Sequence, residues 1–519
     1  MNTILSIAMA PVDWLLAWPD KNNIFLKGMY APAANDCELT ECKVEGELPA
    51  ALEGEFARNG PNPKFAPRSG YHWFDGDGMV HAVRIKDGKA FYSSHQVKTE
   101  KLRLETEAGR AVFLKLGDMS SILAVPRLLN NAVREVLGLQ KNLESMREST
   151  ANTALEYHAG KLLALNEGGL PYQLRVLCDG VLETVGTLTY EGKMQQPFTA
   201  HPKLDPVSGK LYGFGYQLKK QPYMTFYVLD KEGKLERQFP ITIPNPVMMH
   251  DMALTESYVV FLDTPLVMDP SLLIKGQLPL VLKKELGARF GLLPVDATDE
   301  SSIRWFDLPE AFMTFHSLNA WEERGADGKV TKVNVVTCDM DEFDLDISNM
   351  NPDNLPKPTL TVLDLVSGEA TRQQACICEP KTGMDFPQIP RHLLGRKIKY
   401  GYGTVFGKEG YGVEAAKMDL QASSPETAIV GKIPFGEGKV GGECLFIPNT
   451  AQAGTKQSED DGFLVTFVIN EALENSDLCV WNAKTMDPTP VARVKLPVRV
   501  PLGFHALFVS KENLAKQTV

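Results

Sequence analysis

Short apolar runs, each closed by Gly, Asp, Asn or Pro, recur along most of the chain. Residues 49–95 are dense in turn dipeptides such as Asn59-Gly60 and Asp75-Gly76, which join short extended runs. From residue 152 to residue 509, brief β-rich segments follow one another, including KLLALNEGG, TLTVLDLVSG and FLVTFVIN. This pattern predicts an all-β protein built of hairpins and meanders, behind an irregular lead-in over residues 1–45.

Residues 105–147 depart from this pattern, because their apolar positions recur at roughly helical spacing. Pro126 is expected to break the stretch into two helices. Two interpretations stay open here: a pair of helices that pack on the core, or an apolar insertion that lies in a membrane interface. A second interruption, rich in Leu and Pro, covers residues 266–291 and is interpreted as another long insertion.

Composition narrows the class of protein. The 519 residues allow two or three average domains or one large β architecture, and the 44% hydrophobic and 23% charged residues are ordinary for a globular protein. A net charge of −11 argues against a nucleic-acid partner. No apolar run reaches the ~18 residues needed to span a bilayer, and the amino terminus does not resemble a signal or transit peptide. The eight dilute cysteines are interpreted as reduced thiols of an intracellular protein.

Four of the nine histidines share a context, in which an apolar residue precedes the histidine and an extended apolar run lies nearby. They are His201, His250, His316 and His505. Taken singly, each is more typical of an ordinary surface or core histidine. Successive members are 49, 66 and 189 residues apart, and 189 is three times 63. Because a four-stranded propeller blade takes about 40–50 residues, or more with long loops, a β-propeller offers a geometric reason for all four to meet at one axis.

Four converging imidazoles would narrow the chemistry of the site. Neutral imidazole suits Fe, Cu, Zn or Ni. Four such ligands leave two positions open on an octahedral ion, and a redox metal makes better use of them than closed tetrahedral zinc does. A ligating histidine usually donates its other N–H to a carboxylate, for which Glu167, Asp385 and Glu443 are candidates. Glu167 and Glu443 lie beside paired glycines, which permit close backbone approach.

Ten sequence blocks, in order, carry a resemblance to one family. They are GEFARNGPNPKF (54–65), YHWFDGDGMVH (71–81), NTALEYHAGKLLALNEGGLPY (152–172), FTAHPKLDP (198–206), PVMMHDMALTES (246–257), RWF with FHSLNAWEE (304–306, 315–323), DFPQIPRHLLGRKIKYGYG (385–403), GGECLFIP (441–448), DDGFLVTFV (460–468) and VPLGFHALFV (500–509). On these residues the chain resembles the carotenoid cleavage dioxygenase family, and most of all its plant-type branch, which cuts carotenoids at the 9,10 and 9′,10′ double bonds.

The resemblance implies a fold and a site. The fold is a seven-bladed β-propeller over residues 1–519, capped by a dome of loops and helices, with the 105–147 insertion matching an apolar membrane patch. The four iron ligands implied, for one Fe(2+) per chain, are His201, His250, His316 and His505. The carboxylates implied to hold three of these imidazoles are Glu167, Asp385 and Glu443. Thr153 matches a position near the open coordination site. Many relatives carry Glu where this chain has Asp385, although the plant branch also carries Asp, and the shorter side chain reaches about 1.5 Å less far.

The activity implied is that of a non-haem iron dioxygenase. Its substrate is the conjugated C=C bond of an apolar carotenoid or apocarotenoid polyene, its co-substrate is dioxygen, and its products are aldehydes or ketones. One alternative is an enzyme of the same fold that cleaves a stilbene-type phenylpropanoid, and another is a non-catalytic propeller that binds an apolar ligand. A cytoplasmic protein with peripheral contact to an organelle membrane is expected.

Overall fold

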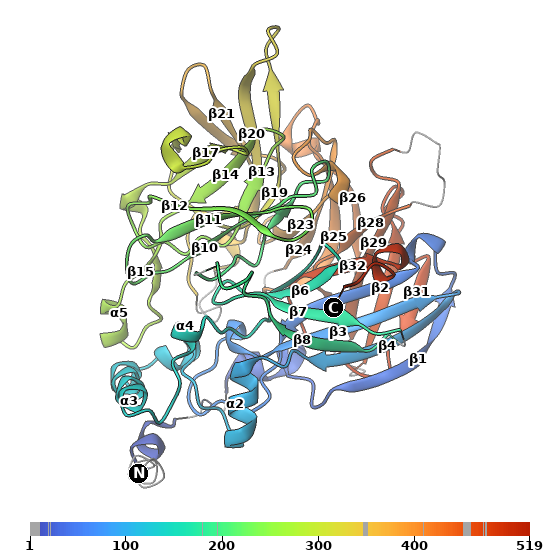
Figure 1. Ribbon diagram of the computed structural model, residues 1–519. Helices are drawn as coiled ribbons and strands as arrows, with labels where there is room; N and C mark the ends of the chain where they lie inside the picture. Colours follow the sequence, from blue (N-terminus) through green and yellow to red (C-terminus); the bar gives the residue numbers. More distant parts are fainter. Residues whose placement is uncertain are drawn as a thin grey trace.

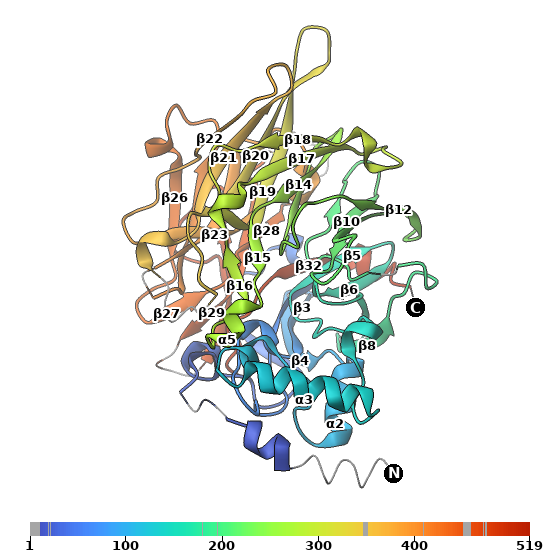
Figure 2. The same ribbon diagram turned by 90° about the vertical axis from the view of Figure 1, so that its left-hand side faces the viewer.

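Antiparallel strands build most of the described chain, and the longer helices gather at one end of the molecule (Figures 1 and 2). In this computed structural model the described residues are 11–518, except 19, 21, 179, 195, 346–350, 408, 450–457, 471 and 473–474. The strands form seven antiparallel groups. Four groups are separate four-stranded sheets, and one 14-stranded sheet contains the other three groups, linked at their edges.

The seven groups follow chain order. The first holds β1 (Cys37–Gly46), β2 (Gly54–Pro61), β3 (Gly78–Lys86), β4 (Lys89–Gln96) and β32 (Ala506–Ser510). The second holds β5 (Ala154–His158), β6 (Lys161–Leu165), β7 (Tyr172–Val176) and β8 (Leu182–Thr187). The third holds β9 (Lys203–Leu204), β10 (Leu211–Tyr216), β11 (Met224–Leu229) and β12 (Leu235–Ile241). The fourth holds β13 (Met252–Leu254), β14 (Tyr258–Asp263), β17 (Arg289–Pro294) and β18 (Arg304–Asp307).

The remaining groups complete the set. The fifth holds β19 (Met313–Arg324), β20 (Val330–Met340), β21 (Lys357–Asp364) and β22 (Ala370–Gln374). The sixth holds β23 (Gly383–Gln388), β24 (Tyr400–Phe406), β25 (Gly412–Asp419) and β26 (Ile429–Pro434). The seventh holds β28 (Leu445–Pro448), β29 (Gly462–Asn470), β30 (Asn475–Asn482) and β31 (Ala492–Lys495), and β27 (Lys439–Gly441) pairs with both β25 and β29.

The groups are the blades of a closed ring. The strands at one edge of neighbouring blades lie side by side, with β13 between β9 and β19, and with β32 between β28 and β5. The ring closes where β32, near the carboxyl end of the chain, pairs with β2, near its beginning. The predicted all-β, seven-bladed propeller is therefore confirmed. Most of the interruption predicted at residues 266–291 is an insertion between β14 and β17, which adds the hairpin of β15 (Leu266–Met268) and β16 (Leu280–Leu282), but its last three residues already belong to β17.

Two local predictions are wrong. The irregular lead-in expected over residues 1–45 ends in a strand, β1, which pairs with β4 and with β31. Pro126 does not break a helix, because it lies in the first turn of α3 (Ala124–Val136), where a missing backbone N–H costs no intrahelical hydrogen bond. The other helices of this region are α2 (Glu100–Ala108) and the short α4 (Leu143–Met146). No helix among the described residues is both long and apolar enough to cross a bilayer.

The propeller core lies between the blades, and it encloses a few charged groups. Every residue of β2 is buried, including Glu55, whose side-chain oxygens have no hydrogen-bond partner within the described residues. Its nearest cation is Arg84, 4.0 Å away. Burial raises the pKa of the Glu55 carboxyl from 4.5 to about 8, and the Arg84 charge offsets only part of this rise.

Replacing Glu55 by Gln is expected to flatten the pH dependence of stability. Because the folded-state pKa of Glu55 is raised, the stability linked to its proton is fully present below about pH 4.5 and is lost as the pH rises towards 8. Relative to wild type, Glu55→Gln therefore gains up to about 4 kcal/mol of unfolding free energy between pH 5 and pH 8, at about 1.4 kcal/mol per unit. Urea unfolding at both pH values measures this gain. Glu41→Gln, on the exposed face of β1, serves as the control and should show no such gain.

Candidate metal centre

Each of the four predicted histidines lies on the strand at the inner edge of a different blade or directly before that strand. His201 precedes β9, His250 precedes β13, His316 is part of β19, and His505 immediately precedes β32. The first three therefore belong to consecutive blades, the third, fourth and fifth. His505 belongs to the first blade, three blades further round the ring than His316, as the long interval between them suggested. The topology thus delivers four side chains to the propeller axis from segments far apart in the sequence.

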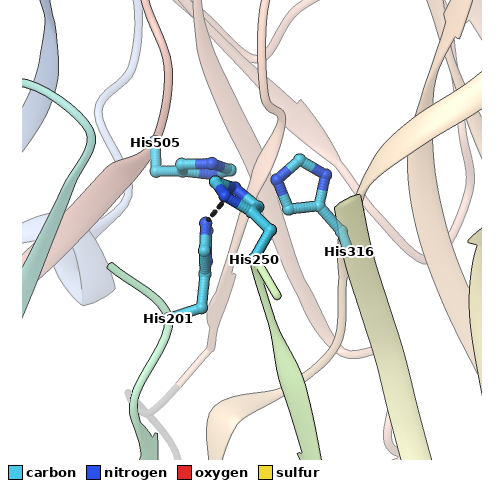
Figure 3. A group of neighbouring side chains, drawn as sticks. All are labelled: His201, His250, His316 and His505. Atoms are coloured by element: carbon cyan, nitrogen blue, oxygen red, sulfur yellow. Dashed lines mark hydrogen bonds between the residues drawn. The ribbon is translucent and has the colours of Figure 1, made fainter. Parts of the chain in front are cut away.

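The structure brings the four imidazoles together in one cluster (Figure 3). One nitrogen of each ring lies within 4.8 Å of the corresponding nitrogen of every other ring. The ring centroid of His201 is 4.6 Å from that of His250, 5.0 Å from that of His316 and 4.5 Å from that of His505. The two Nε2 atoms of His201 and His250 are 3.0 Å apart. This spacing suits nitrogen ligands that share one ion.

Each of the three predicted carboxylates lies within hydrogen-bonding distance of the Nδ1 atom of one imidazole. The Nδ1 of His250 is 2.6 Å from Oε2 of Glu167. The Nδ1 of His316 is 2.8 Å from Oδ1 of Asp385. In the third pair, formed by His505 and Glu443, the Nδ1 is 2.9 Å from Oε1. With each Nδ1–H donated to a carboxylate, the tautomer is fixed, and the Nε2 lone pair is left for a metal.

The shorter side chain of Asp385 reaches its histidine as closely as the two glutamates do. The pairing of β23 with β24 shifts register between Asp385 and Gln388. Within that irregularity, Phe386 has a φ of +50°, and its N–H donates to Oδ1 of Asp385 at 2.8 Å. A bulge of this kind bends a strand and redirects its side chains. The bend places the Asp385 carboxylate against the His316 imidazole without the extra methylene of Glu.

The electrostatics of the cluster favour neutral imidazoles at two positions. Burial, together with the neighbouring histidines, holds the pKa of His201 well below its ordinary value. Burial likewise lowers the pKa of His505, although Glu443 opposes the change. For His316, burial would lower the pKa, but the hydrogen-bonded Asp385 carboxylate raises it above 6.5.

The residues present fit a transition-metal ion. The Nε2 of His316 is buried and has no hydrogen-bond partner within the described chain. A buried polar atom without a hydrogen-bond partner lowers the free energy of unfolding, and a metal–nitrogen bond would remove this penalty. Four imidazole nitrogens without a thiolate are a donor set that suits Fe, Cu, Zn or Ni. The site could therefore hold such an ion.

A cavity of about 420 Å³ opens onto the cluster and includes His250, His316 and His505 in its wall. Its volume lies in the range typical of small-ligand sites, about 300–1,000 Å³. The aromatic side chains that line it include Trp73, Phe74, Phe315, Phe343, Phe386 and Phe504. Thr153 also lines the cavity, and its hydroxyl accepts a hydrogen bond from the side-chain amide of Asn166 at 3.1 Å. Its place near an open coordination position stays a prediction.

Sequence reasoning missed a further layer of contacts behind the carboxylates. The hydroxyl of Tyr216 donates to Oε1 of Glu167 at 2.8 Å. The side-chain amide of Gln388 donates to Oε1 of Glu443, also at 2.8 Å. Tyr216 lies outside the ten sequence blocks, and Gln388 lies within the 385–403 block without a residue type that predicts a role there. Only the strand packing of the folded chain brings both to the site.

The fold and this cluster define a class: an all-β propeller with a polyhistidine centre at its axis, facing an aromatic cavity. Comparison with known proteins gives the family. The profile of the family described as "RPE65: Retinal pigment epithelial membrane protein" matches residues 30–510. The chain is 41% identical to a carotenoid 9,10(9′,10′)-cleavage dioxygenase 1 of Phaseolus vulgaris over 95% of its own length and 90% of that protein's. It is also 41% identical to the enzyme of the same name from Arabidopsis thaliana, over 95% and 91% of the two lengths.

Solved structures agree with the fold. The lignostilbene dioxygenase of Pseudomonas brassicacearum superposes with a TM-score of 0.79 at 27% identity, over 95% of this chain and 99% of that one. A cobalt-substituted oxygenase (ACO) from Synechocystis gives a TM-score of 0.74 at 24% identity, over 97% and 99%, and supports the fold alone. The chain belongs to the RPE65/carotenoid cleavage dioxygenase family, whose named relatives are oxygenase enzymes.

Proposed function

We propose that the protein is an iron-dependent dioxygenase that cleaves a conjugated double bond of a carotenoid or apocarotenoid, at the 9,10 and 9′,10′ positions. One C=C bond and one dioxygen molecule are consumed, and each carbon of the broken bond leaves as a carbonyl group. The observation that carries the proposal is the opening of the four-imidazole cluster onto an aromatic cavity. The names of the plant relatives support the choice of bond.

The roles of the chain's own residues follow from the geometry. His201, His250, His316 and His505 would hold one Fe(2+), which supplies the redox chemistry when bound. Glu167, Asp385 and Glu443 orient three of the imidazoles through their Nδ1–H groups. The aromatic wall would place the polyene beside the open coordination side, near Thr153, and keep water away from the reacting bond.

A stilbene-type phenylpropanoid is the second candidate substrate, because the lignostilbene dioxygenase shares the fold at 27% identity. A phenolic substrate calls for a polar pocket with a Tyr and Lys pair. Tyr30 does line the cavity, but no lysine does within the described residues, and apolar atoms supply most of the exposed wall surface, with Glu342 and Asp344 among the polar residues. This lining favours an apolar polyene.

Incubation of the iron-loaded protein with β-carotene and with an apocarotenal tests the substrate and the bond. Cleavage at the 9,10 bond releases a cyclic methyl ketone from the ring end, because C9 carries a methyl group, and gas chromatography with mass spectrometry identifies it. Aromatic aldehydes formed from a hydroxylated stilbene, with no ketone from β-carotene, would instead establish the second candidate. A protein that binds iron but converts neither substrate would fit the non-catalytic alternative.

We further propose that residues 105–147, predicted above as the membrane-contact insertion, dock the protein on a membrane surface. The helix α3 is amphipathic, yet its apolar face points outward, where Leu129 is 63% and Val136 86% exposed. Its polar face points inward: Arg134 is buried and donates to Oδ2 of Asp13 at 3.0 Å. A soluble helix normally shows the opposite orientation, so the outward apolar face supports contact with lipid.

Neighbouring segments extend this apolar surface. The helical residues 11–16 lie at the same end of the molecule (Figures 1 and 2), where Trp14 is 76% and Leu15 65% exposed. The short α5 (Ser271–Ile274) contacts α3 and exposes Ile274. The cytoplasmic location with contact to an organelle surface stays a prediction, and some relatives carry "chloroplastic" in their names.

The double substitution Leu129→Glu with Val136→Glu is expected to release the protein from phosphatidylcholine vesicles. Burying such a side chain in lipid contributes about 1.5–3 kcal/mol, so losing both should weaken binding at least about a hundredfold. Flotation with vesicles measures the bound fraction. Val366→Glu, at a site 79% exposed in the turn after β21, is the matched control and should float like wild type. Equal flotation of the double variant would contradict membrane docking through α3.

A further inference from the structure

One buried carboxylate, that of Asp251, touches the histidine-bearing segments of three blades. Asp251 directly follows His250 and is 2% exposed. Its Oδ2 accepts hydrogen bonds from the backbone N–H of Ser317 at 2.8 Å and from the Ser317 hydroxyl at 3.0 Å. Its Oδ1 lies 2.7 Å from Nζ of Lys203, and the same oxygen accepts the N–H of Met252 at 2.7 Å.

Each partner of this carboxylate sits next to a cluster histidine in the sequence. Ser317 follows His316 on β19, so the Ser317 N–H belongs to the peptide unit that joins the two residues. Lys203 begins β9, two residues after His201. Asp251 therefore links the third, fourth and fifth blades at the level where each presents its imidazole.

His201 depends on such a link more than the other three histidines do. Its Nδ1 has no carboxylate partner within the described residues, in contrast to the Nδ1 atoms held by Glu167, Asp385 and Glu443. Two contacts hold the segment. The backbone N–H of His201 donates to Oγ1 of Thr199 at 3.0 Å, and the side chain of Lys203 pairs with the Asp251 carboxylate. Charge-assisted hydrogen bonds in a buried setting are short and directional, so the Lys203–Asp251 contact restricts this segment strongly.

We infer that Asp251 is a positioning residue for the metal centre, because its carboxylate fixes the relative places of the segments that carry His201, His250 and His316. The inference rests on the proposed metal site, and it assigns to Asp251 no contact with metal or substrate. Three ligands would then share one anchor, whereas His505 is held separately by Glu443.

The test measures binding of Co²⁺ to the metal-free protein, together with the ligand-field absorption spectrum of the bound ion, in wild type and in Asp251→Asn. The amide is nearly isosteric but carries no charge for Lys203, and its NH₂ group cannot accept a hydrogen bond. Partners that orient metal ligands typically change affinity by about 10–100-fold. We expect a loss of this size in Asp251→Asn, with altered absorption bands that report changed coordination geometry.

Asp460→Asn is the matched control. Asp460 also lies 2.7 Å from a buried lysine, Lys417, and it is away from the histidine cluster and from the cavity wall. A purely structural role for Asp251 predicts that both variants lose thermal stability and that both keep the wild-type Co²⁺ affinity and spectrum. A positioning role predicts that only Asp251→Asn changes the affinity and the bands.

If Asp251→Asn fails to fold, two variants that remove only single contacts of Asp251 provide the test. Lys203→Met removes the charge partner. Ser317→Ala removes one of the two hydrogen bonds that Ser317 donates to Asp251, together with the hydroxyl contact to the Met252 carbonyl. Each should lower the Co²⁺ affinity by less than Asp251→Asn does, and wild-type affinity and spectrum in both would overturn the inference. If wild type itself bound no Co²⁺, the proposed metal site would fail along with the inference. If wild type and Asp251→Asn bound it equally, with the same bands, the inference alone would fail.

Discussion

Replacing His316 by alanine is expected to abolish both iron binding and carotenoid cleavage. The imidazole of His316 is buried, its Nδ1 is engaged by Asp385, and its Nε2 has no hydrogen-bond partner within the described chain. Removing it takes away one of the four proposed nitrogen ligands and leaves the Asp385 carboxylate buried without its imidazole. The loss of affinity should exceed the roughly 10–100-fold typical of changes to the groups that only orient ligands.

Iron content by atomic absorption and ketone formation from β-carotene measure the two losses. His392→Ala is the control, because His392 is exposed and lies outside the cluster, so this variant should keep one iron per chain and full activity. A His316→Ala protein that retained iron and turnover would remove His316 from the ligand set. The same comparison separates an enzyme from a non-catalytic propeller, since only the enzyme loses a product.

Replacing Glu443 by alanine is expected to have the second largest effect. This carboxylate, 4% exposed, accepts from Nδ1 of His505 at 2.9 Å and from the backbone N–H of Ala506 at 2.6 Å. It also accepts from the amide of Gln388 at 2.8 Å. The substitution therefore frees the His505 ring and leaves a buried backbone N–H unpaired. We expect a loss of about 10–100-fold in iron affinity and about 1–3 kcal/mol in the stability of the metal-free protein.

Titration with Fe²⁺ under anaerobic conditions and urea unfolding of the metal-free protein measure the two effects separately. Gln388→Met removes only one of the three donors to the same carboxylate, so it should cost less in both measurements. Unchanged iron affinity in Glu443→Ala would show that the His505 imidazole is held by its own strand and not by the carboxylate.

The sequence allowed the ligand cluster to be predicted because its members stand in distinctive motifs. His201, His250, His316 and His505 follow apolar residues at strand starts, and the structure brings all four together. The three carboxylates that contact these imidazoles were also predicted, but the residues that in turn hold the carboxylates and link the blades were not. Tyr216 is the last residue of a strand with no unusual sequence feature. Asp251 directly follows His250, and that position alone predicts no contact with other blades. Their roles depend on contacts between blades, which local sequence does not encode.

The wrong predictions at β1 and Pro126, and the open question of which way α3 faces, have physical causes. β1 is largely exposed, and it gains its stability from pairing with β4 and with the distant β31, so its own composition gave little strand signal. Proline interrupts the interior of a helix but is tolerated in its first turn, so the presence of Pro126 alone does not show where the helix begins. Helical periodicity identified the apolar residues of α3 that share a face, but periodicity cannot say whether that face meets the core or the outside.

X-ray absorption at the iron edge of the reconstituted protein reports directly which atoms bind the metal. We expect one iron per chain bound by four imidazole nitrogens, whose outer ring atoms give the multiple-scattering pattern of histidine. Sulfur scatterers, or fewer than four imidazoles, would contradict this expectation.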